Sequence, residues 1–245
     1  MINISYETWN EACVLVKDYS KKYGKFYMQL YPFYRFNNLG NISSKSFYVS
    51  YVKSGAIFSK YDNFDKIDNY CRKSDGSYRK RFLLTPIMYI YYIAIGLHIS
   101  KKYNQKRNKE IYVKYGGDFE NRNLHYRNSY SQFVKFISNE SFNYNYYYKL
   151  DISDCFNKID INLLTKLLST SFQFNQKEQM IFKEFIKWCG DGSFPQTECG
   201  VTSSYLATII YFDIIDNRLF NLLSKDEKIK KFKICRYVDD LYILI

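Results

Sequence analysis

The sequence has few histidines and no closely spaced cysteines, and this excludes the common zinc-binding patterns. The two histidines stand at positions 98 and 125, and no Cys-x-x-Cys pair occurs. Structural zinc sites need four such ligands at short, regular spacings. Without paired spacings there is also no disulfide framework, so we expect free thiols and a reducing cytoplasm. The six cysteines are Cys13, Cys71, Cys155, Cys189, Cys199 and Cys235.

The N-terminus lacks the apolar core of a secretory signal peptide, because Glu7 and Glu11 interrupt it early. Long uncharged stretches are also scarce, and residues 82–99 form an 18-residue stretch without a charge. A membrane span needs about 20 apolar residues, and a helix that begins near Pro86 is shorter than that. We therefore favour a buried core helix over a membrane span and expect no membrane partner.

Acidic residues are in the minority, with 24 Asp and Glu against 36 Lys and Arg, so the net charge is +12. A strongly basic domain predicts a polyanionic partner, either nucleic acid or an anionic membrane surface. Hydrophobic residues make up 47% of the 245 residues, which argues against disorder and allows a sizeable core.

The first 70 residues contain one clear helical pattern, over residues 8–23. Thr8 and Glu11 can form a capping box at its start, and Gly24 can end it. Residues 25–70 show no regular period and are not assigned.

The middle of the chain predicts one strand and one helix between polar segments. Residues 78–84 have the composition of a strand, and an apolar helix is expected to begin near Pro86. Residues 101–110 and 114–130 are polar or rich in Gly, Asn and Arg, and we expect loops there.

From residue 146 the pattern becomes regular, with a strand over 146–152 and a helix capped by Asp160. Further elements follow, and this order favours an α+β fold in which helices cover one face of an antiparallel sheet. They are helices over 176–189 and 202–223 and a hairpin of strands 232–237 and 241–245.

The hairpin carries Asp239 and Asp240 at its turn. Two adjacent carboxylates repel each other and lose hydration when buried, and a divalent cation removes that cost. The alternative is a pair of solvated turn aspartates. Asp151 lies near the end of the predicted strand 146–152, and pairing of strands in one sheet can bring it beside Asp239 and Asp240. Three converging carboxylates suit two Mg²⁺ or Mn²⁺ ions, which activate a hydroxyl and stabilise a pyrophosphate leaving group.

Three consecutive cations, Arg79, Lys80 and Arg81, lie on the predicted strand 78–84. Side chains alternate along a strand, so Arg79 and Arg81 share one face and Lys80 takes the other. Guanidinium groups suit phosphate oxygens, so this face is a candidate phosphate clamp. The alternative is a solvated charge cluster.

Four segments together resemble the motifs of reverse transcriptases, in the same order along the chain. The motifs resembled are a fingers motif, motif A, motif B and motif C with its Tyr-x-Asp-Asp box. The segments are Tyr78–Arg81 with Pro86, Lys149–Phe156, Phe194–Gln196 with Thr202–Ala207, and Tyr237–Asp240.

The resemblance implies the fingers and palm of a right-hand polymerase. It divides the chain into a mainly helical N-terminal extension over residues 1–70, fingers over 71–145 and a palm over 146–245. No thumb follows residue 245 in this sequence, so we expect a partner chain, a further C-terminal part or a second copy to supply it. Nucleic acid, RNA or DNA, and deoxynucleoside triphosphates (dNTPs) are the expected partners.

The resemblance also assigns roles to individual residues. Asp151 and Asp239 would be the principal metal ligands, with Asp240 supporting them and the backbone of Ile152 contributing. Phe156 would be the steric gate against a ribose 2′-hydroxyl. The remaining expected nucleotide-binding residues are Arg79, Lys80, Arg81, Ser153, Asp154, Cys155 and Gln196.

Motif B departs from the family pattern, because Thr197 stands where a glycine usually follows Pro-Gln. Among reverse transcriptases, the chain looks most like the bacterial abortive-infection and other defence-associated group. That likeness implies a role in antiphage defence, with untemplated or protein-primed DNA synthesis as alternatives to templated synthesis. The competing hypothesis is a palm-like domain without catalysis that serves as an RNA-binding or assembly subunit.

Overall fold

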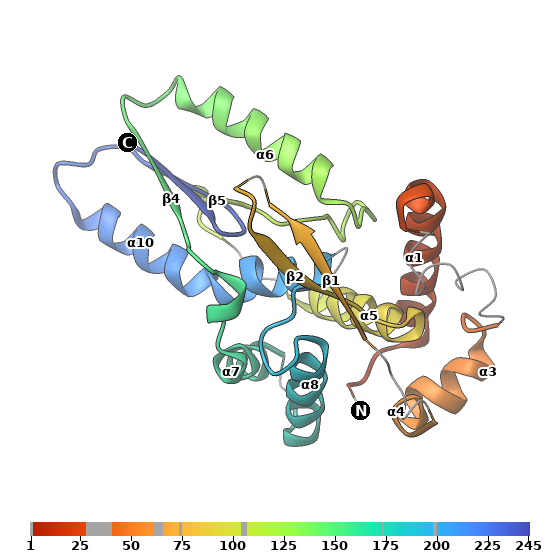
Figure 1. Cartoon of the computed structure of the whole chain (residues 1–245). Coiled ribbons are helices and arrows are strands. Elements are labelled where there is room, and N and C mark those ends of the chain that lie inside the picture. Colours follow the sequence, from red (N-terminus) through yellow and green to blue (C-terminus); the bar gives the residue numbers. More distant parts are fainter. Residues whose placement is uncertain are drawn as a thin grey trace.

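The computed structural model describes residues 2–27, 41–60, 66–73, 75–103, 107–172, 174–197 and 200–245. They form a mixed α+β structure (Figure 1). The N-terminal part consists of helices α1 (Tyr6–Tyr27), α3 (Lys45–Phe47), the π-helical segment η2 (Tyr48–Lys53) and α4 (Ala56–Lys60). Strands β1 (Ile67–Arg72) and β2 (Tyr78–Leu83) then form a two-stranded antiparallel sheet of their own.

A four-stranded sheet forms the second part of the fold, in the order β3-β5-β6-β4. Its strands are β3 (Ile111–Lys114), β4 (Tyr147–Asp151), β5 (Lys233–Tyr237) and β6 (Asp240–Leu244). The β5–β6 hairpin and β4 confirm the predicted strands. The predicted all-antiparallel sheet is wrong at one edge, because β3 runs parallel to β5. This strand also precedes residue 146, where the palm was expected to begin.

Helices cover both faces of this sheet, whereas the sequence predicted one covered face (Figure 1). Successive side chains of a strand point to opposite faces. Ile234 of β5 therefore packs with residues of α10 (Asp213–Lys225), and Cys235 packs with Phe133 of α6 (Tyr126–Ser141). Residues 114–130 were expected to be a loop throughout, but α6 already begins at Tyr126, where the His125 side chain accepts a hydrogen bond from the Arg127 amide.

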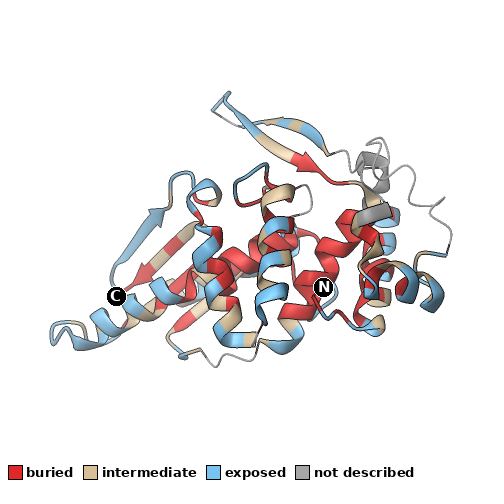
Figure 2. Ribbon diagram, turned by 90° about the horizontal axis from the view of Figure 1, so that it is seen from below, coloured by how far each residue is buried: buried red, intermediate tan, exposed pale blue. Residues whose placement is uncertain are grey.

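Helix α5 (Pro86–Lys102) forms the centre of the core, and every residue from Ile87 to Ile99 is buried. Figure 2 shows the buried residues concentrated in the middle of the molecule. Gly96 allows the close approach of a neighbouring helix, since a Cβ there would lie 2.6 Å from Thr202 Oγ1. The prediction of a core helix is thus confirmed, and within the described ranges no helix is long and apolar enough to cross a membrane.

The predicted limits of the first helix are wrong at both ends. Helix α1 begins at Tyr6, because Ser5 rather than Thr8 provides the cap: Ser5 Oγ accepts a hydrogen bond from the Thr8 amide at 3.2 Å. The helix then continues through Gly24 to Tyr27. A glycine inside a helix costs only about 1 kcal/mol, which packing of the helix against α5 can offset.

The remaining helices follow the prediction, with one interruption. Helix α7 (Ile161–Phe172) is capped by Asp160 as expected, and α8 spans Gln176–Cys189. The single helix expected over 202–223 is divided into α9 (Val201–Tyr205), the π-helical segment η4 (Leu206–Tyr211) and α10.

Candidate active site

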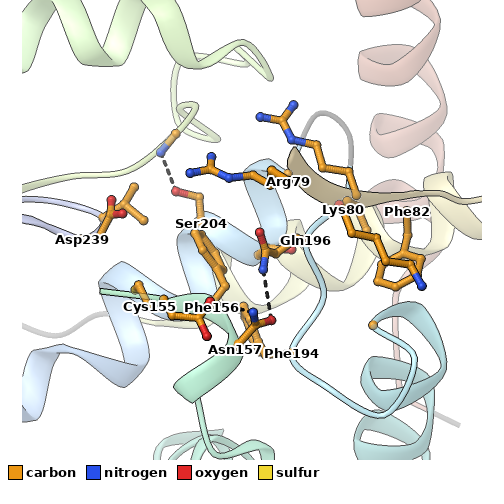
Figure 3. Close-up of a pocket in the computed structure, with 18 of the residues that line it drawn as sticks. Arg79, Lys80, Phe82, Cys155, Phe156, Asn157, Phe194, Gln196, Ser204 and Asp239 are labelled. Carbon is orange, nitrogen blue, oxygen red and sulfur yellow. Dashed lines mark hydrogen bonds between the residues drawn. The ribbon is translucent and has the colours of Figure 1, made fainter. Parts of the chain in front are cut away.

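A cavity of about 910 Å³ lies where the β5–β6 turn, the end of β4, β2 and residues 193–197 meet. These segments come from four distant parts of the sequence, and Figure 3 shows their side chains around one space. Polar and charged groups of both signs line it, together with the rings of Phe156 and Phe194. A cavity of this size, with a few convergent polar groups, is the usual form of a small-molecule site.

The sheet register brings the predicted aspartates together. Asp151, the last residue of β4, is paired with Asp240 of β6, and Asp239 lies in the turn beside them. Asp151, Ile152 and Asp239 line the cavity, whereas Asp240 is not among its lining residues. Its carboxylate Oδ1 lies 3.2 Å from Lys149 Nζ, so Asp240 is engaged in an ion pair.

The pKa of Asp239 is raised, first by its burial and then by the negative charges of Asp151 and Asp240. A hydrogen bond from the backbone of Asp239 and the positive charge of Arg79 act in the opposite direction. A bound cation would counter the same repulsion. The carboxylate therefore lies in a place where positive charge is strongly favoured.

The donors at this position suit a hard cation, because Asp151 and Asp239 supply carboxylate oxygens and no histidine is among the described residues that line the cavity. Cys155 lies nearby, but burial and the charge of Asp239 raise its pKa to about 12, so it stays a neutral thiol. In the described part of the chain, no group of three or more His, Cys, Asp or Glu side chains is placed to hold a metal ion. Asp151 and Asp239 thus offer the type of oxygen ligand that Mg²⁺ prefers, while Asp240, the third predicted ligand, is paired with Lys149.

The three predicted phosphate-clamp residues all line the cavity, but their surroundings differ. Arg79 extends toward Asp239 (Figure 3), and its charge acts on that carboxylate. Lys80 turns toward Phe82 and forms ion pairs with Asp68 at 3.0 Å and Asp191 at 3.8 Å. Lys80 is therefore committed to other carboxylates, whereas Arg79 is directed toward Asp239.

The segment that follows Asp151 forms the floor of the cavity. Asp154, at φ +55°, turns the chain into the short 3₁₀ helix η3 (Phe156–Lys158). The Phe156 ring stacks on Phe194 with their centroids 5.9 Å apart. Ser153 does not line the cavity and instead accepts a hydrogen bond from Lys158 Nζ.

Gln196 is tied to this floor through a residue that the sequence did not single out. Its amide nitrogen donates to Asn157 Oδ1 at 3.1 Å, and Asn157 Nδ2 donates to Asp154 Oδ1 at 2.6 Å (Figure 3). The Phe82 amide also donates to the Gln196 carbonyl at 2.9 Å. Residues 194–197 are thus anchored on two sides, by the floor and by β2, although Thr197 replaces the expected glycine.

Five of the six cysteines lie in the part of the chain that the structure describes, and all five are free thiols, as predicted. Cys199 lies outside the described residues.

Comparison with known proteins assigns no family. No family model matches the chain, and no curated protein matches it either.

Proposed function

We propose that this chain is a nucleotidyltransferase of the reverse-transcriptase type, which adds deoxynucleotides to a hydroxyl group. The observation that carries the proposal is the β4–β6 register, which brings Asp151 next to the Asp239–Asp240 turn. The placement of Arg79 and Phe156 around the same cavity supports it. In this proposal residues 146–245 together with strand β3 form the palm, because β3 belongs to the same sheet, and the first part of residues 71–145 acts as fingers.

In the proposed reaction, a hydroxyl oxygen attacks the α-phosphorus of a dNTP, the bond to pyrophosphate breaks, and the hydroxyl proton leaves. Asp151 and Asp239 would hold Mg²⁺ or Mn²⁺, which would supply the positive charge that an in-line displacement at phosphorus requires. Arg79 binds and orients the triphosphate, since a guanidinium suits phosphate oxygens. Gln196, held by Asn157, positions the nucleotide.

Phe156 supports deoxynucleotides as the substrate class. Its ring is braced by Phe194, so it has little freedom to move away from a bulkier sugar. A ribose 2′-hydroxyl that met this ring would clash with it, whereas a deoxyribose would not. The +12 charge supports a nucleic-acid partner. From the resemblance to the defence-associated group, we propose antiphage defence as the biological role.

One observation favours a second candidate, a palm-like domain without catalysis that binds RNA or assembles with a partner. Asp240 is paired with Lys149 instead of joining the other two carboxylates. A scaffold tolerates such a pair, whereas a three-carboxylate metal site does not use it.

The test is nucleotide incorporation by the purified chain with labelled dNTPs, RNA or DNA templates and Mg²⁺ or Mn²⁺. Reactions without template and without primer belong in the same experiment. We expect incorporation by the wild type and none by Asp239→Asn with Asp240→Asn. Equal incorporation by both proteins would refute the enzyme, and RNA binding without incorporation by either would favour the second candidate.

A further inference from the structure

Arg236 is the fourth residue of the five-residue strand β5, and its charged side chain is fully buried. Its partner is Asp216 of α10, which is also fully buried. Arg236 Nε donates to Asp216 Oδ1 at 2.8 Å, and Nη2 donates to the same oxygen at 2.6 Å. The Phe212 ring covers the guanidinium, with its centroid 5.0 Å from Cζ. The pair is therefore sealed from water and held in one geometry.

The third nitrogen of the guanidinium reaches the turn that carries Asp239. Arg236 Nη1 donates to the Val238 carbonyl oxygen at 3.4 Å. Val238 has a φ of +55°, a left-handed conformation that β-branched residues rarely adopt. Such a conformation persists only where its surroundings enforce it, and it is concentrated at functional sites.

We infer that Arg236 and Asp216 are positioning residues, which hold the Val238 carbonyl and thereby fix Asp239 at the mouth of the cavity. The inference rests on the proposed function for its catalytic meaning, but the geometry of the turn can be measured without it. Neither residue lines the cavity, so neither contacts a bound nucleotide there.

Stability alone does not account for this pair. Replacing a buried ion pair by apolar residues of similar volume is often neutral or stabilising, because burial costs each charge its hydration. What an apolar replacement cannot supply is the hydrogen bond to Val238. The consequence specific to this pair is therefore the conformation of the turn.

A second Arg–Asp pair on the same helix provides a matched control. Arg107 Nε lies 3.1 Å from Asp213 Oδ1, and its Nη2 donates to the Ile209 carbonyl in η4 at 2.8 Å. The Arg107 and Asp213 side chains are 18% and 8% exposed, so this pair too is largely buried. It contacts the π-helical segment instead of the catalytic turn, so its loss should perturb that segment.

The experiment compares Arg236→Lys with Arg107→Lys in the full chain, by amide hydrogen exchange of the peptide 237–241 relative to a core peptide of α5. The guanidinium reaches Asp216 and Val238 at the same time, and a lysine ammonium cannot reproduce this planar arrangement of donors. We expect faster exchange of the turn in Arg236→Lys only. We also expect kcat to fall on the order of 100-fold, as displaced catalytic groups can cause, while KM for dNTP stays within about threefold.

A second variant guards against misfolding of Arg236→Lys. Arg236→Met with Asp216→Leu leaves no unpaired buried charge, and it should fold while showing the same fast exchange and low kcat. Wild-type exchange of the turn in both Arg236 variants, or equal acceleration in Arg107→Lys, would overturn the inference. If the wild type itself incorporates no nucleotide, the proposed function fails, and the exchange comparison still decides whether the pair fixes the turn.

Discussion

The two sides of the cavity each contribute an aspartate, yet they are built in opposite ways. The strand β5, which leads to Asp239, is buried along most of its length and contains the sealed Arg236–Asp216 pair. The strand β4, which ends in Asp151, is exposed at all five residues. One side is thus fixed by the core before any ligand arrives, whereas the other meets solvent.

Because of this difference, we expect Asp239 and Asp151 to respond differently when a ligand binds. A half-buried carboxylate is held in place at the expense of part of its hydration, and the raised pKa of Asp239 reflects that cost. An exposed strand end can shift slightly as a cation and a nucleotide enter. The account therefore predicts that changes on the two sides affect stability differently, even where they affect catalysis alike.

The largest expected effect comes from Asp239→Asn and Asp151→Asn, each of which should lower incorporation by about 1,000-fold or more. A metal ion contributes several kcal/mol to the transition state, and about 1.4 kcal/mol is a factor of ten. Single-turnover incorporation at saturating Mg²⁺ measures this. A loss confined to Asp239→Asn would show that Asp151 is not a ligand.

The same two variants separate the two sides by stability. The pKa of Asp239 is raised in the folded protein, so the folded state binds this proton more tightly and stability falls as pH rises through the raised pKa. Without divalent cations, Asp239→Asn should therefore raise Tm at pH 7 and not at a pH below the ordinary aspartate pKa. Asp151→Asn, at an exposed strand end, should raise Tm at pH 7 by less, because it removes only the repulsion of Asp239 and not the larger effect of burial. Equal Tm shifts in the two variants would contradict the proposed difference between the two sides of the cavity.

Arg79 and Lys80 extend the comparison to β2. Arg79→Ala should raise KM for dNTP by roughly tenfold or more, the effect of losing a charge-assisted hydrogen bond to phosphate. Lys80→Ala should change KM by less than about twofold, because Lys80 pairs with Asp68 and Asp191 and exposed pairs contribute little. Steady-state kinetics with one dNTP measures both. A larger rise in KM for Lys80→Ala than for Arg79→Ala would place the phosphates nearer Lys80 and Asp191, on the side of α8.

Phe156 lies on the exposed side, just after Asp151, but Phe194 braces its ring. Phe156→Ala should improve ribonucleotide use relative to deoxynucleotides by about tenfold, because the clash with the 2′-hydroxyl disappears. The ratio of kcat/KM for the two sugars is the measurement. Phe194→Leu is the matched control and should show a smaller change in the same direction. An unchanged ratio in Phe156→Ala would show that Phe156 is not a steric gate.

The smallest effect is expected from Asp240→Asn, within about tenfold, because Asp240 is paired with Lys149 outside the cavity lining. Single-turnover incorporation compared with Asp239→Asn provides the measurement. A loss as large as that of Asp239→Asn would mean that Asp240 leaves Lys149 and joins the metal site during the reaction.

The sequence predicted those parts of the fold in which local pattern and burial agree. Helix α5 is a continuous apolar run with clear ends, and the β5–β6 hairpin consists of two short β-prone segments on either side of a turn, so their type followed directly. The sequence did not predict strands β1 and β3 or the start of α6. These elements lie in polar or aromatic segments whose structure depends on partners distant in sequence. The pairing of β3 with β5 is one such contact.

The motifs that resemble those of reverse transcriptases named Asp151, Asp239, Arg79 and Phe156, and the structure places all four around one cavity, while their roles stay predictions. The detailed contacts at the cavity could not be predicted. Sequence could not reveal that Asp240 would turn to Lys149, which depends on neighbouring side chains. Arg236 was detectable in principle, because a charge within the apolar strand Phe232–Tyr237 is rarely buried without a partner. Its partner Asp216 carries no such signal.

The central claim is that Asp151, at the end of an exposed strand, and Asp239, in a half-buried turn, together hold a divalent cation in the cavity. Anomalous diffraction from crystals grown with Mn²⁺ and a dNTP tests this most directly. The account predicts a manganese peak within coordination distance of both carboxylates, with the triphosphate beside Arg79. Manganese bound elsewhere, or a cavity with nucleotide and no manganese between the two aspartates, would contradict it.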